Sequence, residues 1–267
     1  DVLALTVTGS AIYIGGAFTT VGGEARTRLA VISAVDGSLS SSWSPSPTVD
    51  NGTVHSMTVL GNNIYVVGTF TSANGVTRNR AAAFDRFTGE LQAWNPNLNG
   101  AATGVTVYNN IVYIAGSFTT VNGGTARIGV AAFNITDGST ASWNADLNAS
   151  ASDVISSGGT IYVGGIFTTA RSGTSRPYGA AFNPVTAALT SWNPLANAEI
   201  KRLVVSSSGS ILIGGSFTAL NGSTRHYLGE VSASAGLPTS WNPMANSSVH
   251  AITEIGTVVY FGGEFTA

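Results

Sequence analysis

Residues 12–19 read IYIGGAFT, and this phrase decides the fold because it returns along the whole chain. The later copies read IYVVGTFT at 64–71, VYIAGSFT at 112–119, IYVGGIFT at 161–168, ILIGGSFT at 211–218 and VYFGGEFT at 259–266. The tryptophans recur with the same period of about 49 residues, at Trp43, Trp94, Trp143, Trp192 and Trp241. Self-similarity at such a period is the signature of a repeat architecture.

One repeat predicts four short strands. In the second repeat these are residues 54–60, 64–72, 80–85 and 91–94, rich in β-branched and aromatic residues. Asn74 and Gly75 predict a tight turn, and Pro96 ends the fourth strand because proline has no N–H to donate to a ladder. No segment shows a sustained 3.6-residue apolar period, which disfavours helical repeats.

Tandem four-stranded units of roughly 40–50 residues are typical of a β-propeller. The sequence therefore predicts an all-β fold with one propeller domain over 1–267. Five repeats cover about 1–50, 51–100, 101–149, 150–198 and 199–247, and a half repeat covers 248–267. We expect six blades with the last one incomplete in this chain. We also expect the chain to be part of a longer secreted protein, because it starts at Asp1 with no signal peptide.

The composition excludes several function classes. Charged residues are 9% of the chain against roughly 25% in an average protein, and the net charge is -2. Nucleic acid is therefore not an expected partner. The chain has no cysteine, which rules out disulfides and thiolate metal sites. No apolar run approaches the roughly 18 residues of a membrane span, so no membrane insertion is expected in this segment.

The stretch AAFDRFTGELQAW at 82–94 resembles the tryptophan-docking repeat of quinoprotein propellers, with one extra residue before Trp94. The fuller phrase, I/V-Y-V-G-G-x-F-T, then N-G, R-x-x-A-A-F-[DN] and S-W-N-P, is more similar to the delta-60 repeat propellers of secreted and surface-attached bacterial proteins. That resemblance spans essentially all 267 residues. It implies an extracellular scaffold or recognition role, and it brings no shared catalytic residues.

A quinoprotein-like enzyme is the third alternative, and the residues disfavour it. Such enzymes commonly hold calcium through Glu, Asn and Asp beside a vicinal disulfide, whereas here the acids are dispersed and cysteine is absent. His55 and His250 occupy equivalent places in different repeats, and His226 follows a repeat arginine. Matching positions in different blades lie on a ring, so we expect no metal site and no cofactor.

One arginine recurs at the same place before each third strand. In a chain with only 11 basic residues, this predicts a repeated geometric role, through hydrogen bonds to carbonyls of a neighbouring loop or stacking on an aromatic ring. The alternative is a ring of cations that binds an acidic or glycan ligand. The positions are Arg26, Arg78, Arg127, Arg176 and Arg225.

The tryptophans open two interpretations. As wedges between blades they are structural, at Trp43, Trp94, Trp143, Trp192 and Trp241. The glycan-binding alternative pairs a ring that stacks a sugar with an amide that binds its hydroxyls. Its candidates are Trp94 with Asn95, Trp192 with Asn193, and Trp241 with Asn242, with the variant corners Trp43-Ser44-Pro45 and Trp143-Asn144-Ala145.

We therefore expect a non-catalytic structural or interaction module at the cell surface or outside the cell, within a larger secreted or surface-assembled protein. Its expected partners are other surface subunits or further copies of itself, joined by strand complementation of the incomplete blade. Glycans are the alternative partners, in a lectin-like propeller.

Overall fold

The computed structural model describes residues 1–40, 43 and 48–266. These residues form strands, turns and loops, and none of them lies in a helix, so the predicted all-β class is confirmed. In the part of the chain that the structure describes, no helix is long and apolar enough to cross a membrane. The corner residues Ser44 and Pro45 lie outside the described residues.

The chain divides into two compact units. One comprises Asp1–Ile114, Phe118–Arg127 and Ala132–Ser142, and the other comprises Ala115–Ser117, Ile128–Ala131 and Trp143–Ala267. The division passes through one sheet, so it does not coincide with a repeat boundary.

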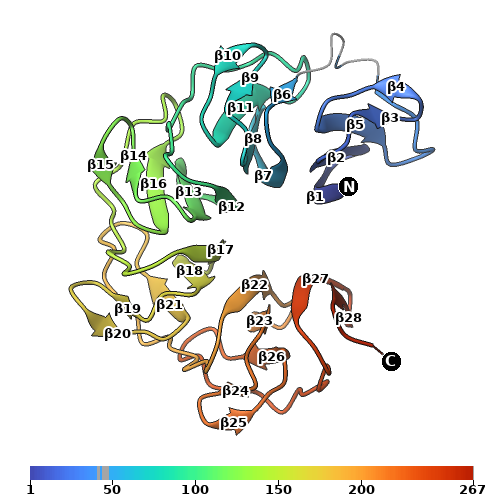
Figure 1. The fold of residues 1–267 in the computed structure, drawn as a ribbon. Helices are drawn as coiled ribbons and strands as arrows, with labels where there is room; N and C mark the ends of the chain where they lie inside the picture. The colour runs from blue at the N-terminus through green and yellow to red at the C-terminus, as the bar shows by residue number, and fades with distance from the viewer. Residues whose placement is uncertain (41–42, 44–47, 267) are drawn as a thin grey trace. The chain divides into compact units, whose positions relative to one another are not determined.

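One antiparallel sheet of three strands returns in each of the five complete repeats, with the second strand in the middle (Figure 1). We number these sheets by repeat. Sheet 1 contains β1 (Val2–Thr8), β2 (Ala11–Gly16) and β5 (Leu29–Ser33); sheet 2 contains β7 (Val54–Leu60), β8 (Asn63–Gly68) and β11 (Ala81–Asp85); sheet 3 contains β12 (Ala102–Tyr108), β13 (Ile111–Gly116) and β16 (Val130–Asn134); sheet 4 contains β17 (Ala151–Ser157), β18 (Thr160–Gly165) and β21 (Gly179–Phe182); sheet 5 contains β22 (Ile200–Val205), β23 (Ile211–Gly215) and β26 (Leu228–Val231).

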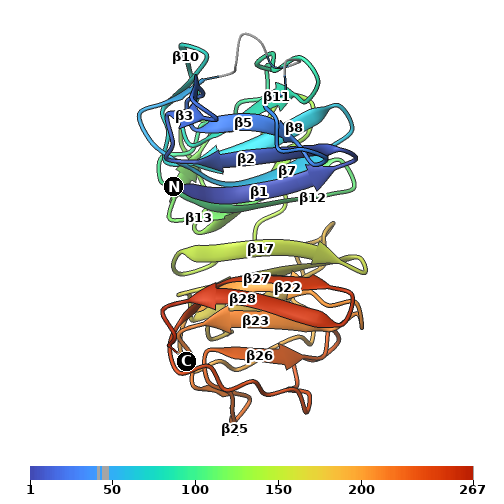
Figure 2. The ribbon, with the colours of Figure 1, turned by 90° about the vertical axis from the view of Figure 1, so that its right-hand side faces the viewer.

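Sheet 6 differs, because in the described residues it holds only β27 (Val249–Ile255) and β28 (Val258–Gly263). Both are visible beside the C-terminus in Figure 2. Its register matches that of the other first and second strands, including the irregularity between Val249 and Ala251. Sheet 6 therefore corresponds to the first two strands of the three-stranded sheet in each complete repeat.

A short hairpin separates the second and third strands of each complete repeat. In the second repeat its turn is formed by Asn74 (φ 47°) and Gly75 (φ 73°), which confirms the predicted tight turn. The hairpins are β3 (Thr20–Val21) with β4 (Glu24–Ala25), β9 (Ser72–Ala73) with β10 (Val76–Thr77), β14 (Thr120–Val121) with β15 (Thr125–Ala126), β19 (Thr169–Ala170) with β20 (Thr174–Ser175), and β24 (Ala219–Leu220) with β25 (Ser223–Thr224); β6 (Val49–Asp50) pairs with β9.

Two predicted strands are shorter than the sequence indicated. The second strand of repeat 2 ends at Gly68 rather than at residue 72. The fourth strand is reduced to one antiparallel bridge, between Phe84 and Leu91 in repeat 2. The segment after Leu91 leaves the sheet. The Trp94 side chain at its end is buried and contacts the ring of Tyr65.

The core lies between consecutive sheets. In the first unit, Val54 and Met57 of β7 pack with Tyr13 of β2 in one apolar cluster. The third strands are rich in alanine, and Ala81, Ala82 and Ala83 are fully buried, as expected where sheets pack closely. Consecutive sheets therefore bury one another's faces.

Candidate functional site

Four of the five tryptophans are buried, and Trp94 shows their contacts best. Its side chain is 1% exposed, and its Nε1 donates to the carbonyl of Asn134 at 3.0 Å. The ring makes edge contacts with Tyr65 and Phe133, with centroids 5.1 and 6.3 Å apart. Trp94 thus joins its own sheet to the end of the next third strand.

The other tryptophans follow this pattern in part. Nε1 of Trp143 donates to the carbonyl of Asn183 at 3.0 Å, and Nε1 of Trp43 donates to that of Arg86 at 2.9 Å. Trp192 is fully buried with no hydrogen-bond partner for Nε1. Trp241 is only half-buried. The buried rings occupy the place expected of wedges between sheets.

The glycan-binding candidates are placed unequally. The rings of Trp94 and Trp192 face protein, and Asn95 and Asn193 beside them are half-buried. Of these pairs, Trp241 with the exposed Asn242 offers the most open surface. Trp94 with Asn95 belongs to the first compact unit and the other two pairs belong to the second, and sugar binding stays a prediction.

The repeated arginines bind carbonyls. Arg78 donates from Nη1 to Thr77 O at 3.1 Å and from Nη2 to Gln92 O at 3.0 Å. The second bond ties the hairpin to the segment that leads into Trp94. Burial lowers the pKa of Arg78 below its ordinary value. Arg127, Arg176 and Arg225 make the same pair of bonds, and Arg26 makes the first of them.

A repeated asparagine was missed by the sequence reasoning. Oδ1 of Asn99 accepts from the backbone N–H groups of Thr119 and Thr120, at 2.8 and 3.0 Å, while its Nδ2 donates to Thr119 Oγ1. The signal was present in the chain, because each such asparagine lies five residues after a tryptophan. The equivalent residues are Asn148, Asn197 and Asn246.

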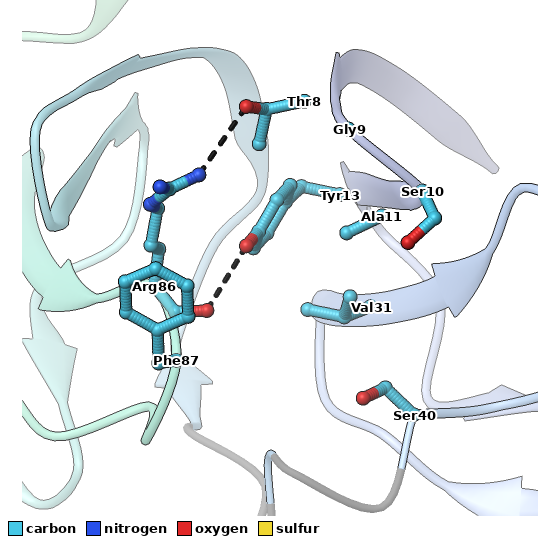
Figure 3. Close-up of a pocket in the computed structure, with 9 residues that line it drawn as sticks. All are labelled: Thr8, Gly9, Ser10, Ala11, Tyr13, Val31, Ser40, Arg86 and Phe87. Carbon is cyan, nitrogen blue, oxygen red and sulfur yellow. Dashed lines mark hydrogen bonds between the residues drawn. The ribbon is translucent and has the colours of Figure 1, made fainter.

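A pocket of about 480 Å³ opens where sheets 1 and 2 meet (Figure 3). Tyr13 donates from its hydroxyl to Arg86 O at 3.0 Å, and the Arg86 guanidinium donates to Thr8 Oγ1 at 3.2 Å. The guanidinium also lies 4.3 Å from the ring centre of Phe87, which is 52% exposed. The sequence reasoning did not single out Arg86 or Phe87, because each occurs in one repeat only.

Ionisable groups gather on sheets 4 to 6. Asp153 is buried and accepts from the N–H groups of Val154 and Leu203 at 2.9 Å, and its carboxylate lies 3.8 Å from the Arg202 guanidinium. Burial raises the pKa of Asp153, although Arg202 and the two N–H groups oppose this. His250 pairs with Glu264 at 3.0 Å on the surface.

The histidines do not come together as a ligand set. His55 lies on β7, where burial lowers the pKa of its imidazole, and His226 stacks edge-on against Tyr227. Within residues 1–40, 43 and 48–266, no group of three His, Cys, Asp or Glu side chains could hold a metal ion.

Two sheet faces are uncovered. Val2 and Leu5 on β1 are 53% and 61% exposed, although their equivalents on β7, Val54 and Met57, are buried. At the other end, Tyr260 on β28 is 53% exposed, whereas Tyr13, Tyr65, Tyr113 and Tyr162 at the same place are buried.

No protein-family model matches the chain, and no curated protein sequence matches it. Among solved structures, the crystal structure of the computationally designed Ika8 protein is similar, with a TM-score of 0.52 and 13% identity over 98% of this chain and 80% of that chain. The computationally designed Ika4 protein aligns with a TM-score of 0.45 and 14% identity, over 68% of this chain and 91% of that chain. The likeness to Ika8 shows a shared fold, and it carries no statement about function.

Proposed function

We propose that the six repeats are the blades of a six-bladed β-propeller, which serves as a non-catalytic structural or interaction module. The support is a packing contact, here called the junction, between the second strand of one sheet and the first strand of the next. It occurs in both compact units. A Cβ atom on Gly15 would lie 2.5 Å from Val54 Cγ1 of the next sheet, and one on Gly164 would lie 2.5 Å from Ile200 Cγ2. Gly15, Gly164 and the equivalent Gly214 thus leave room for the first strand of the following sheet, whereas repeat 2 has Val67 at this place.

The uncovered face of β1 resembles one side of this junction, and the uncovered face of β28 resembles the other side. Val2 and Leu5 correspond to the residues that enter it, and Gly262 corresponds to the glycine that receives them. A Cβ atom on Gly262 would meet nothing within 4 Å. In a closed ring of six blades, these two faces would cover each other.

Engineered cysteines test this ring, because the chain has none of its own. Cysteines at Val2 and Gly262 are expected to form a disulfide within one chain. At the corresponding place in sheets 4 and 5, a Cβ on Gly164 would lie 3.1 Å from Cβ of Ile200, so a small shift of the strands brings such a pair to the roughly 3.5–4.5 Å between disulfide-bonded Cβ atoms. The pair Gly164→Cys with Ile200→Cys, inside one unit, is the positive control. Cross-linking of the control pair alone, with the first pair staying reduced, would contradict the ring.

The bonds of the repeated side chains support a structural or interaction role. The repeated arginines and asparagines and three of the tryptophans bind protein groups. Trp94 and Asn99 bond to the following repeat, and Arg78 bonds within its own repeat. Recognition would then use surfaces that differ between repeats. The secreted or cell-surface setting that we propose rests on the resemblance of the repeat phrase to delta-60 repeat propellers.

The tryptophans distinguish this function from a lectin. Trp94→Ala and Trp192→Ala are expected to unfold the protein or to lower its melting temperature strongly, because each removes a buried ring. Thermal melts and a glycan array on the same samples provide the measurement. Saturable sugar binding that is lost in both variants at an unchanged melting temperature would overturn the structural assignment.

Glycan binding remains a second candidate because of the pocket in Figure 3. The exposed Phe87 ring could stack on a sugar, while Arg86 and the hydroxyls of Thr8, Ser10 and Ser40 border the same hollow. Phe87→Ala is then expected to abolish sugar binding. Val185→Ala, at the same place in repeat 4 and also exposed, is the matched control.

A further inference from the structure

A polar hollow of about 380 Å³ lies between repeats 2 and 3, within the first compact unit. Asn79, Arg80 and Asn97 line it from repeat 2, and Gly123 and Gly124 line it from the hairpin of repeat 3. Among the described residues that line it, none is acidic and none is aromatic. The Arg80 guanidinium therefore gives the hollow a net positive charge.

Arg80 occupies a position that differs from repeat to repeat. This position precedes the third strand, and its backbone lies in the left-handed region in every complete repeat, at φ between 60° and 74°. Its occupants are Arg28, Arg80, Gly129, Tyr178 and Tyr227. The backbone is thus constant here, and the side chain alone changes the surface.

The glycine and the tyrosines at this position pack against the following repeat. A Cβ atom on Gly129 would lie 3.0 Å from the backbone N of Ala151. Tyr178 packs on the apolar cluster that includes Ile200, and Tyr227 is placed in the same way. These residues therefore close the space that stays open beside Arg80.

The two arginines at this position point to different repeats. Arg28 donates from Nε to Gly52 O of the following repeat. Arg80 turns back, and its Nη1 donates to Thr69 O and, at 3.2 Å, to Phe70 O of its own repeat. Its Nη2 is not buried and donates to none of the described residues. Arg80 thus leaves the hollow open and keeps a donor for a ligand.

Two amides stand beside Arg80. Nδ2 of Asn79 donates to Oδ1 of Asn97 at 2.8 Å. This bond leaves Oδ1 of Asn79 as an acceptor and Nδ2 of Asn97 as a donor without partners among the described residues. The corner of Asn97, at φ 46°, keeps positive φ in the next three repeats, where it carries Asp146, Leu195 and Met244. A donor and an acceptor side by side match a hydroxyl, which both accepts and donates.

We infer that this hollow binds a hexuronate, a sugar whose ring carries a carboxylate. The inference deepens the proposed interaction role by naming a ligand class. The Arg80 guanidinium binds the carboxylate through charge-assisted hydrogen bonds, and Asn79 and Asn97 bind ring hydroxyls. A Cβ atom on Gly123 or Gly124 would meet nothing within 4 Å, so the opposite wall leaves room for the ring.

Glucuronate is the probe, titrated into the intact, ¹⁵N-labelled 267-residue chain and followed by NMR. Saturable shifts of the side-chain amide signals of Asn79 and Asn97 are expected. Glucose lacks the carboxylate and acetate lacks the hydroxyls, so each should bind at least about tenfold more weakly. Equal affinity for glucose or for acetate would overturn the assignment to a hexuronate.

Exchanges between repeats provide variants whose side chains the fold already holds at the same place. Arg80→Tyr, with the residue of repeats 4 and 5, and Asn97→Leu, with the residue of repeat 4, should each weaken glucuronate binding at least about tenfold. Leu195→Asn, the reverse exchange in repeat 4, is the matched control and should leave the affinity unchanged. Thermal melts of the same samples check folding, and Asn97→Leu decides the test if Arg80→Tyr does not fold.

Two further outcomes overturn the inference: no saturable binding of glucuronate, or unchanged affinity in the folded variants of Arg80 and Asn97. The cysteine cross-link separates this failure from that of the propeller, because the hollow lies within one compact unit. A disulfide between positions 2 and 262 without glucuronate binding removes this site alone. Glucuronate binding without the disulfide removes the ring and leaves the site in place.

Discussion

Sheets 4 and 6 carry similar versions of one sequence phrase, IYVGGIFT and VYFGGEFT, in different surroundings. Tyr162 is buried on β18 and donates to Ala233 O at 2.9 Å, whereas Tyr260 at the same place on β28 is exposed. A Cβ atom on Gly164 would lie against Ile200, whereas a Cβ atom on Gly262 would meet nothing within 4 Å. The difference teaches that the phrase specifies a strand pair, while the neighbouring sheet determines whether its aromatic residue belongs to a core.

The largest expected difference concerns the tryptophans. Trp143→Ala should lower the free energy of unfolding by about 3–5 kcal/mol, because it empties a buried site and leaves Asn183 O without its donor. Trp241→Ala should cost less than about 1.5 kcal/mol, since its ring is half-solvated already. Urea denaturation of both variants measures this. Equal losses would show that sheet 6 is covered in solution.

A smaller difference is expected for the glycines. Gly164→Ala should destabilise by about 1–3 kcal/mol, because the new Cβ would overlap Ile200 and force the two sheets apart. As long as β28 is uncovered, Gly262→Ala should be neutral or stabilise by up to about 1 kcal/mol, through reduced freedom of the unfolded chain. A clear loss in Gly262→Ala, measured by the same denaturation, would mean that β1 covers β28 as the proposed ring requires.

The smallest expected difference concerns pH and the two ion pairs. Burial raises the pKa of Asp153 in the folded state above the unfolded value of roughly 3.9, so the folded state binds a proton more readily. Stability from this group is present below about pH 4 and is lost as the pH rises through the folded pKa. The stability of the parent relative to Asp153→Asn should therefore decline above about pH 4.

The surface pair provides the contrast. His250→Ala should change the free energy of unfolding by less than about 0.5 kcal/mol, because His250 and Glu264 are both well exposed. Denaturation midpoints of the parent and both variants between about pH 4 and pH 8 test the contrast. A parent that gains stability over Asp153→Asn with rising pH would show that Arg202 outweighs desolvation.

Much of the local structure was predictable, and the reason is chemical. β7 has the bounds that alternation predicts, and the Asn74-Gly75 turn follows from residues that tolerate positive φ. The carbonyl bonds of Arg78 followed from a repeated cation in a chain poor in charge. The fourth strand was overestimated, because β propensity cannot reveal that Trp94 turns out of the sheet into a core.

The sequence by itself determined the repeat, its strands and turns, and the tryptophan and arginine positions, because these depend on residues close along the chain. Only the tertiary structure decided that Trp94 and Trp192 are buried, that Asn99 clasps a neighbouring hairpin, and that Tyr260 and Trp241 are left partly open. Burial depends on which sheet packs there from elsewhere in the chain, and similar phrases do not record which neighbour that is.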